Sequence, residues 1–151
     1  MIRYRQFVEE NFLIDDARTG QLVPFMFRPV QARYYEQLVK DYDIENKGLT
    51  VPVREIILKS RREGFSSLIL ALFAADDILN VNPTETLVIS YKDDSTGTFR
   101  KRYRTFITTY AAKKHGHTVD KIRATPHLLE KMAKKMFSVD STDLELRHNR
   151  A

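Results

Sequence analysis

The chain has 151 residues, a mass of 17.7 kDa and a net charge of +5, with 42% hydrophobic and 30% charged residues. This size and composition indicate one folded domain with a real core and exclude a disordered chain, and the absence of cysteine excludes disulfides and thiolate metal sites. No apolar run is long enough to span a membrane and no signal-peptide pattern opens the chain, so we expect a soluble intracellular protein without a membrane partner.

The first fifty residues are predicted to form two helices joined by polar turns. An amphipathic helix is expected from Tyr4 to Leu13, followed by a turn from Asp15 to Gly20. A second helix is predicted from Pro29 to Lys40, because proline suits a first helical turn and apolar residues recur there on one face. The polar, glycine-containing segment from Asp43 to Thr50 is predicted to be a loop.

After residue 50, strand patterns and helix patterns alternate. Short apolar or alternating runs predict three strands, at Arg54–Lys59, Thr86–Tyr91 and Thr142–Arg147. Longer segments with buried or amphipathic patterns predict three helices, at Ser66–Asn80, at Asp93–Ala112 and from Pro126 onward. This alternation predicts an α/β fold with a mostly parallel sheet and flanking helices.

Several polar residues have weaker claims to a functional role. The side chains of adjacent acids such as Asp76 and Asp77 diverge on a helix or strand, so we interpret these pairs as solvated turns. Asp93 has a better claim, because it follows a predicted strand at the edge where α/β proteins bind ligands. His115 and His117 have no nearby carboxylate or third ligand, so we assign no metal site to them.

The positive charge is concentrated in the C-terminal part of the chain. Residues 1–94 carry 12 Lys and Arg against 15 Asp and Glu, whereas residues 95–151 carry 13 against 5. The acid-free stretch between positions 94 and 120 contains four clustered cations: Arg100, Lys101, Arg102 and Arg104. Such a patch suits nucleic acid, and it is also typical of the solvated face of an ordinary helix.

Residues 59–67 read KSRREGFSS and lie between a predicted strand and a predicted buried helix. A phosphate loop, GxxxxGK[ST], has the same neighbours; its backbone amides cradle phosphates, its lysine reaches them and its hydroxyl holds Mg²⁺. Here Gly64 and Ser66 stand in the expected positions, Phe65 replaces the lysine, and Lys59 stands where the first glycine belongs. Cations and serines beside a helix N-terminus favour an anionic ligand.

These segments resemble the large subunit of the tailed-bacteriophage terminase, the ATPase that packages DNA into capsids. That family uses a variant phosphate loop with the lysine at the front and an apolar residue before the serine, as in KSRREGFS. The segment FMFRPVQARYY resembles the family's adenine-recognition segment, and ETLVISYKDDSTGTFRKRY resembles the strand and helix after the loop. The resemblance covers most of residues 20–112 and is specific mainly at these three segments.

The resemblance implies a P-loop NTPase-like fold within the terminase ATPase domain. It implies an N-terminal helical and adenine-recognition segment in about residues 1–50 and a phosphate-loop α/β core in about residues 51–151. Gln31 would contact adenine through its amide, together with Arg28 and with Tyr34 or Tyr35. Read without the resemblance, Gln31 is an exposed helix residue.

The resemblance also implies ATP and Mg²⁺ as cofactors of the loop. Lys59 would supply charge to the β- and γ-phosphates, Ser66 would hold Mg²⁺ with support from Ser67, and Arg61 or Arg62 would contact the γ-phosphate. Phe65 would pack rather than bind. The complete set of residues assigned to the nucleotide is Arg28, Gln31, Lys59, Ser60, Arg61, Arg62, Glu63, Gly64, Phe65, Ser66 and Ser67.

Hydrolysis by this class of motor needs a second acidic motif, the Walker B strand ending in Asp-Glu, and the sequence contains none after Tyr91. We therefore expect the front part of a terminase large subunit, without its nuclease domain, that binds ATP but does not hydrolyse it. The missing strand would leave the sheet incomplete and favour self-association through its edge. The family implies double-stranded DNA, the terminase small subunit and the portal protein as partners, in the cytoplasm of a bacterial host.

Two other readings remain open from the sequence. The basic cluster from Arg100 to Arg104 fits a non-enzymatic nucleic-acid-binding domain, whose DNA affinity would depend strongly on salt and not on ATP. A packaging motor would also grip DNA phosphates without reading sequence, so the two functions can coexist. A structural fragment with no activity of its own is the third reading.

Overall fold

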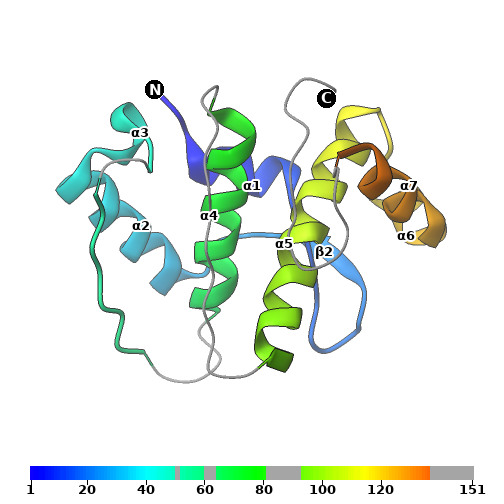
Figure 1. Cartoon of the computed structure of the whole chain (residues 1–151), viewed down its shortest axis with the longest axis horizontal. Helices are drawn as coiled ribbons and strands as arrows, with labels where there is room; N and C mark the ends of the chain where they lie inside the picture. The colour runs from blue at the N-terminus through cyan, green and yellow to red at the C-terminus, as the bar shows by residue number, and fades with distance from the viewer. Residues whose placement is uncertain (50–51, 60–63, 81–92, 137–151) are drawn as a thin grey trace.

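The computed structural model of the protein describes residues 1–49, 52–59, 64–80 and 93–136 (Figure 1). Helices make up most of these ranges: α1 (Tyr4–Asn11), α2 (Pro29–Tyr42), α3 (Ile44–Lys47), α4 (Phe65–Leu79), α5 (Asp93–Lys114), α6 (Val119–Ala124) and α7 (Pro126–Met136). Two short strands, β1 (Leu13–Asp15) and β2 (Leu22–Pro24), complete the described elements. Within these ranges no helix combines the length and the apolar character needed to cross a bilayer.

The expected α/β architecture with a mostly parallel sheet is wrong. In the described part of the chain the only sheet is the antiparallel pair of β1 and β2. Residues 54–59, expected to be a buried strand, form no strand, and the side chains of Ile56 and Leu58 are 91% and 94% exposed. An apolar β-branched run becomes a buried strand only when neighbouring strands pair with it, and here none of the described residues does. The other two expected strands, Thr86–Tyr91 and Thr142–Arg147, lie outside the described residues.

The helices expected from the sequence are confirmed, and their ends follow local rules. Helix α2 starts at Pro29, which has no N–H to leave unsatisfied in the first turn. Helix α5 ends at Lys114 and is closed by Gly116, whose φ of 83° is left-handed; the Gly116 N–H donates to the Lys113 carbonyl and the His117 N–H to the Ala112 carbonyl. This is the Schellman arrangement, which satisfies the last carbonyls of a helix.

Two short helices were not expected. Helix α6 begins after Thr118, whose hydroxyl oxygen accepts a hydrogen bond from the Lys121 N–H at 3.3 Å. Helix α3 is a single turn inside the segment that the sequence predicts to be a loop. Elements this short carry too few residues for a periodic pattern.

The β1–β2 hairpin surrounds the expected turn. The Asp16 carboxylate closes the turn by accepting hydrogen bonds from the Arg18 N–H at 3.1 Å and the Thr19 hydroxyl at 3.0 Å. These donors lower the pKa of Asp16, the Arg18 amide most of all. The Leu13 N–H donates to the Thr109 hydroxyl at 3.2 Å, which attaches the hairpin to α5.

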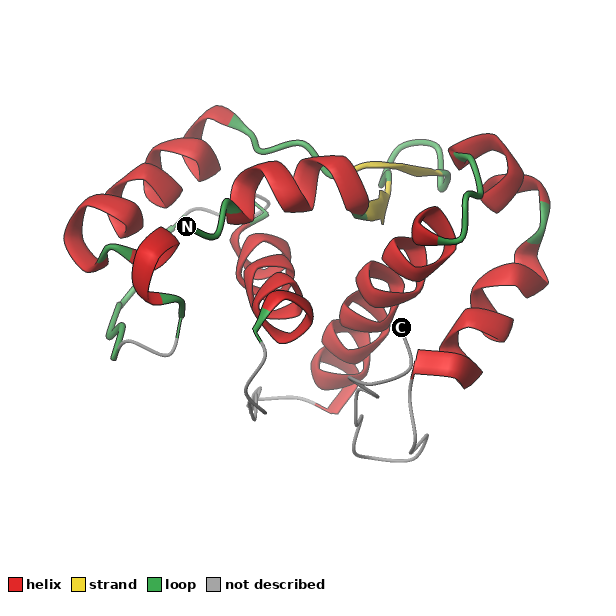
Figure 2. Ribbon diagram, turned by 90° about the horizontal axis from the view of Figure 1, so that it is seen from above, coloured by secondary structure: helices red, strands yellow, loops and turns green. Residues whose placement is uncertain are grey.

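Helices α4 and α5 form the centre of the molecule. They pack against each other, α1 lies against both, and α7 packs against α5 on the other side (Figure 2). Helix α4 is buried on most of its circumference, as its nearly continuous apolar sequence predicts.

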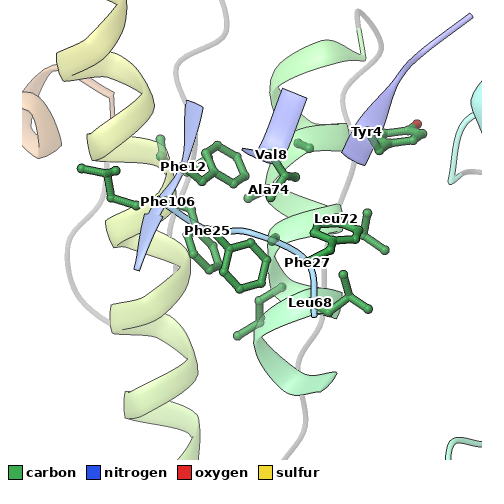
Figure 3. Packing of buried hydrophobic residues seen from close by; sticks show 14 of the residues in the cluster. Tyr4, Val8, Phe12, Phe25, Phe27, Leu68, Leu72, Ala74 and Phe106 are labelled. Carbon is green, nitrogen blue, oxygen red and sulfur yellow. The ribbon is translucent and has the colours of Figure 1, made fainter. Parts of the chain in front are cut away.

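A chain of aromatic contacts crosses the core from α5 to α2 (Figure 3). The rings of Phe12 and Phe106 stack with their centroids 5.2 Å apart. Phe25 lies 5.6 Å from Phe106 and 5.9 Å from Phe27. Phe27 then meets Tyr35 of α2 edge to face at 5.7 Å. These pairs add to the burial energy of their rings and hold the segment between β2 and α2 against the helices.

The interpretation of Asp76 and Asp77 as solvated turn residues is also wrong. Both lie inside α4 and are 4% and 7% exposed. The Tyr4 hydroxyl of α1 donates to Asp76 Oδ1 at 2.6 Å, and the Tyr103 hydroxyl of α5 donates to Asp77 Oδ2 at 2.5 Å. Burial, together with the adjacent carboxylate, raises the pKa of each tyrosine, so both hydroxyls remain donors at neutral pH. Sequence spacing did not reveal these partners because they come from distant segments.

We expect Tyr4→Phe to lower the free energy of unfolding by about 2 kcal/mol, because it removes the hydroxyl that donates to the buried Asp76 carboxylate. Urea unfolding followed by circular dichroism measures the change. Tyr42→Phe is the matched control, since the Tyr42 hydroxyl donates to Glu55 at the surface, and it should leave the free energy of unfolding nearly unchanged. Equal losses in the two variants would contradict the role given to the buried pair.

Candidate ligand-binding pocket

The N-terminus of α2 is held by the Gln31 side chain. Gln31 Oε1 accepts a hydrogen bond from the Arg28 N–H at 2.9 Å, which satisfies a backbone donor ahead of the first turn. Gln31 is only 2% exposed, so its amide lies inside the protein. The interpretation of this residue as an exposed helix residue is therefore wrong.

The same amide links α2 to the N-terminus of α4. Gln31 Nε2 donates to the Gly64 carbonyl at 2.9 Å, and the Leu68 N–H donates to the same oxygen at 3.0 Å. Gly64 precedes α4 with a φ of 74°, a left-handed conformation that glycine adopts without steric cost. The segment assigned to adenine and the end of the segment assigned to phosphate therefore lie side by side, although 33 positions separate them.

A cavity of about 480 Å³ opens at this junction. This volume is within the range of small-molecule sites. Four segments line it: the β1–β2 hairpin and the residues after it, the start of α2, the start of α4 and one face of α5. The lining residues are Ile14, Asp15, Asp16, Ala17, Val23, Pro24, Phe25, Met26, Arg28, Gln31, Gly64, Ser67, Thr98, Lys101, Arg102, Thr105 and Phe106.

The lining of the pocket combines apolar and charged groups. The hairpin and the core contribute an apolar surface that includes Pro24, Phe25 and Met26. The cations on the pocket are Arg28, Lys101 and Arg102, and Asp15 and Asp16 of the hairpin are its acids. A ligand with a flat apolar part and an anionic part matches this composition.

One hydroxyl on the pocket has no partner within the described ranges. Ser67 is 7% exposed, lines the cavity and makes no side-chain hydrogen bond to another described residue. It lies in the first turn of α4, where the backbone N–H groups have no intrahelical acceptors. An unused hydroxyl beside these N–H groups can interact with a polar group of a ligand.

The other residues of the expected phosphate loop are distributed differently. Lys59 is exposed at the end of the unpaired segment, and Ser66 is half-buried in the first turn of α4. Phe65 is buried and contacts the Tyr34 ring edge to face, with 5.4 Å between the centroids, so it packs as expected. Ser60, Arg61, Arg62 and Glu63 lie outside the described residues.

The four cations assigned to nucleic acid do not share one surface. Lys101 and Arg102 line the pocket, whereas Arg100 and Arg104 are engaged in other interactions. The sequence does not indicate this division, because it depends on which face of α5 meets α4 and the hairpin. Met26, Thr98 and Thr105 also line the pocket, and the sequence assigned none of them to a site.

In the part of the chain that the structure describes, no three His, Asp or Glu side chains gather closely enough to hold a metal ion. Burial and nearby positive groups lower the pKa of His117, so this side chain is mainly neutral at neutral pH.

Comparison of the chain with protein-family models, with curated proteins and with solved structures gives no match. The geometry of the pocket is therefore the basis for the function proposed below.

Gly64→Ala should destabilise the protein more than Gly20→Ala. Both glycines have a left-handed φ, which costs a non-glycine residue about 1–2 kcal/mol. A Cβ at Gly64 would approach Gln31 Nε2 to 2.7 Å, while a Cβ at Gly20 would meet nothing within 4 Å. We expect an additional loss of about 1 kcal/mol at Gly64 in urea unfolding, because the Gln31 bond must shift. Equal losses would mean that this contact contributes nothing.

Proposed function

We propose that the chain is the ATP-binding portion of a terminase-like DNA-packaging motor and that the nucleotide occupies the pocket between α2, α4, α5 and the hairpin. The observation that carries the proposal is the hydrogen bond between Gln31 and Gly64. It brings together the two segments that, by resemblance, recognise adenine and phosphate.

The chemistry of the pocket supports a nucleotide. The apolar surface beside Pro24 and Met26 suits a flat base, and the cations and the start of α4 suit phosphates. Ser67 lines the pocket and supplies a hydroxyl without a partner among the described residues, and Ser66 supplies a second hydroxyl in the same helical turn.

These residues also fit Mg²⁺ as a companion of the nucleotide. Magnesium usually keeps several waters and binds through substrate phosphates with few protein ligands, so it does not require a cluster of carboxylates. By the resemblance Ser66 would hold it, from the first turn of α4 next to Ser67, which lines the pocket. Bound Mg²⁺ would neutralise part of the phosphate charge, while the protein residues orient the nucleotide.

A fluorescent ATP analogue tests the proposal by titration in the presence of Mg²⁺. We expect saturable binding to the unmodified chain and at least tenfold weaker binding to the Arg28→Gln, Ser67→Ala double variant, because both residues line the pocket and each supplies a group that would contact phosphate. Lys40→Ala, on the exposed surface of α2, is the charge-matched control and should bind as the unmodified chain does. No saturable binding at millimolar nucleotide would refute the proposed site.

DNA is proposed as a second ligand because of the exposed cations of α6 and α7. Residues 113–135 contain seven Lys and Arg against two acids, and Lys131, Lys134 and Lys135 are all exposed. A surface of this kind binds duplex phosphates without reading sequence.

The dependence of DNA affinity on salt tests this second proposal. We expect the slope of log affinity against log salt to become shallower by about 2 to 3 when Lys131, Lys134 and Lys135 are changed to glutamine, since each phosphate contact releases about one counterion. A control with Lys40→Gln and Lys47→Gln, on α2 and α3, should leave the slope unchanged. An unchanged slope in the triple variant would place DNA binding elsewhere or exclude it.

A further inference from the structure

We infer that Lys101 and Arg102 of α5 bind the phosphates of the nucleotide, a role that differs from the DNA contact expected for them from sequence. The inference rests on the proposed function, because it assumes that the pocket holds a nucleotide. It adds α5 to the two segments that, by resemblance, contact adenine and phosphate.

Lys101 and Arg102 lie on the face of α5 that lines the pocket. Thr98, Lys101, Arg102 and Thr105 all line the pocket, and their spacing of three to four residues defines one face of a helix. Arg100 and Arg104 stand one helical turn apart and belong to a different face. The basic cluster is therefore divided by the helix, and only the pocket-facing pair lies beside Gln31 and Ser67.

Lys101 and Arg102 differ from the other two cations of the cluster in their interactions. Arg100 and Arg104 already interact with other groups, whereas within the described ranges Lys101 and Arg102 form no ion pair and no side-chain hydrogen bond. Lys101 is exposed and Arg102 is half-buried, and neither has an acceptor among the described residues. Both cations can therefore pair with an anion that enters the pocket, and the planar guanidinium of Arg102 suits phosphate in particular.

The acids on the pocket do not neutralise this pair. The Asp16 carboxylate is used by the Arg18 N–H and the Thr19 hydroxyl of the hairpin turn. Asp15 is exposed and forms no ion pair with Lys101 or Arg102. Arg28, at the start of α2, adds a third positive charge to the lining. A polyphosphate in the pocket would therefore contact cations from α5 and from the start of α2.

The test compares two variants with the same change in net charge. In the first, Lys101→Gln and Arg102→Gln remove the pocket cations; in the second, Lys40→Gln and Lys47→Gln remove two exposed cations outside the pocket lining. Binding of a fluorescent ATP analogue, of adenosine and of duplex DNA is measured for both. We expect the first variant to bind the ATP analogue about ten to a hundred times more weakly, with adenosine affinity nearly unchanged, because only the phosphates lose charge-assisted contacts.

Each outcome decides a separate question. No nucleotide binding by the unmodified chain would refute the proposed function and this inference with it. Normal binding by the unmodified chain with equal affinities in the two variants would overturn the inference alone. Parallel loss of adenosine and of the ATP analogue in the first variant would also overturn it, since that result indicates a collapsed pocket. If the first variant lost DNA affinity without losing nucleotide affinity, Lys101 and Arg102 would be DNA contacts, and the inference would be overturned.

Discussion

The Gln31 amide is the interaction on which the site depends. One side chain accepts from the backbone ahead of α2 and donates to the carbonyl ahead of α4, so the starts of two helices share a single buried group. An amide can do this because it carries an acceptor and a donor on the same planar unit. Gly64 permits the contact, since the space that a Cβ would fill is taken by Gln31 Nε2. The pocket is the space that remains beside this junction.

The helices were predictable because their signals are local. The proline at the start of α2, the apolar length of α4 and the aromatic period of α5 each identify a helix without reference to the rest of the chain. The prediction of a strand at residues 54–59 was wrong. A strand forms only where a neighbouring strand pairs with it, and an apolar sequence pattern does not guarantee that pairing. Asp77 illustrates the same limit, since its burial depends on a tyrosine in α5.

The candidate site was predictable in part. Motif spacing pointed to Arg28, Gln31, Gly64 and Ser67, and all four line one cavity. The sequence did not indicate that the Gln31 amide would hold two helices together, nor that α5 would contribute two of its cations. Those facts depend on the packing of α5 against α4 and on the hairpin attached by Thr109. Motifs therefore identified the pocket residues at the starts of α2 and α4. The pocket residues of α5 and of the hairpin were set by tertiary packing.

The two buried tyrosine–aspartate bonds also fix the angular position of α4. Asp76 and Asp77 are consecutive, so their side chains leave the helix about 100° apart, and one is held by α1 while the other is held by α5. Rotation of α4 about its axis would break at least one of these bonds. Ser67 lies nine residues earlier, about 13 Å along the same rigid rod. The direction in which its hydroxyl faces the pocket is thus set at the far end of the helix, by residues that never approach a ligand.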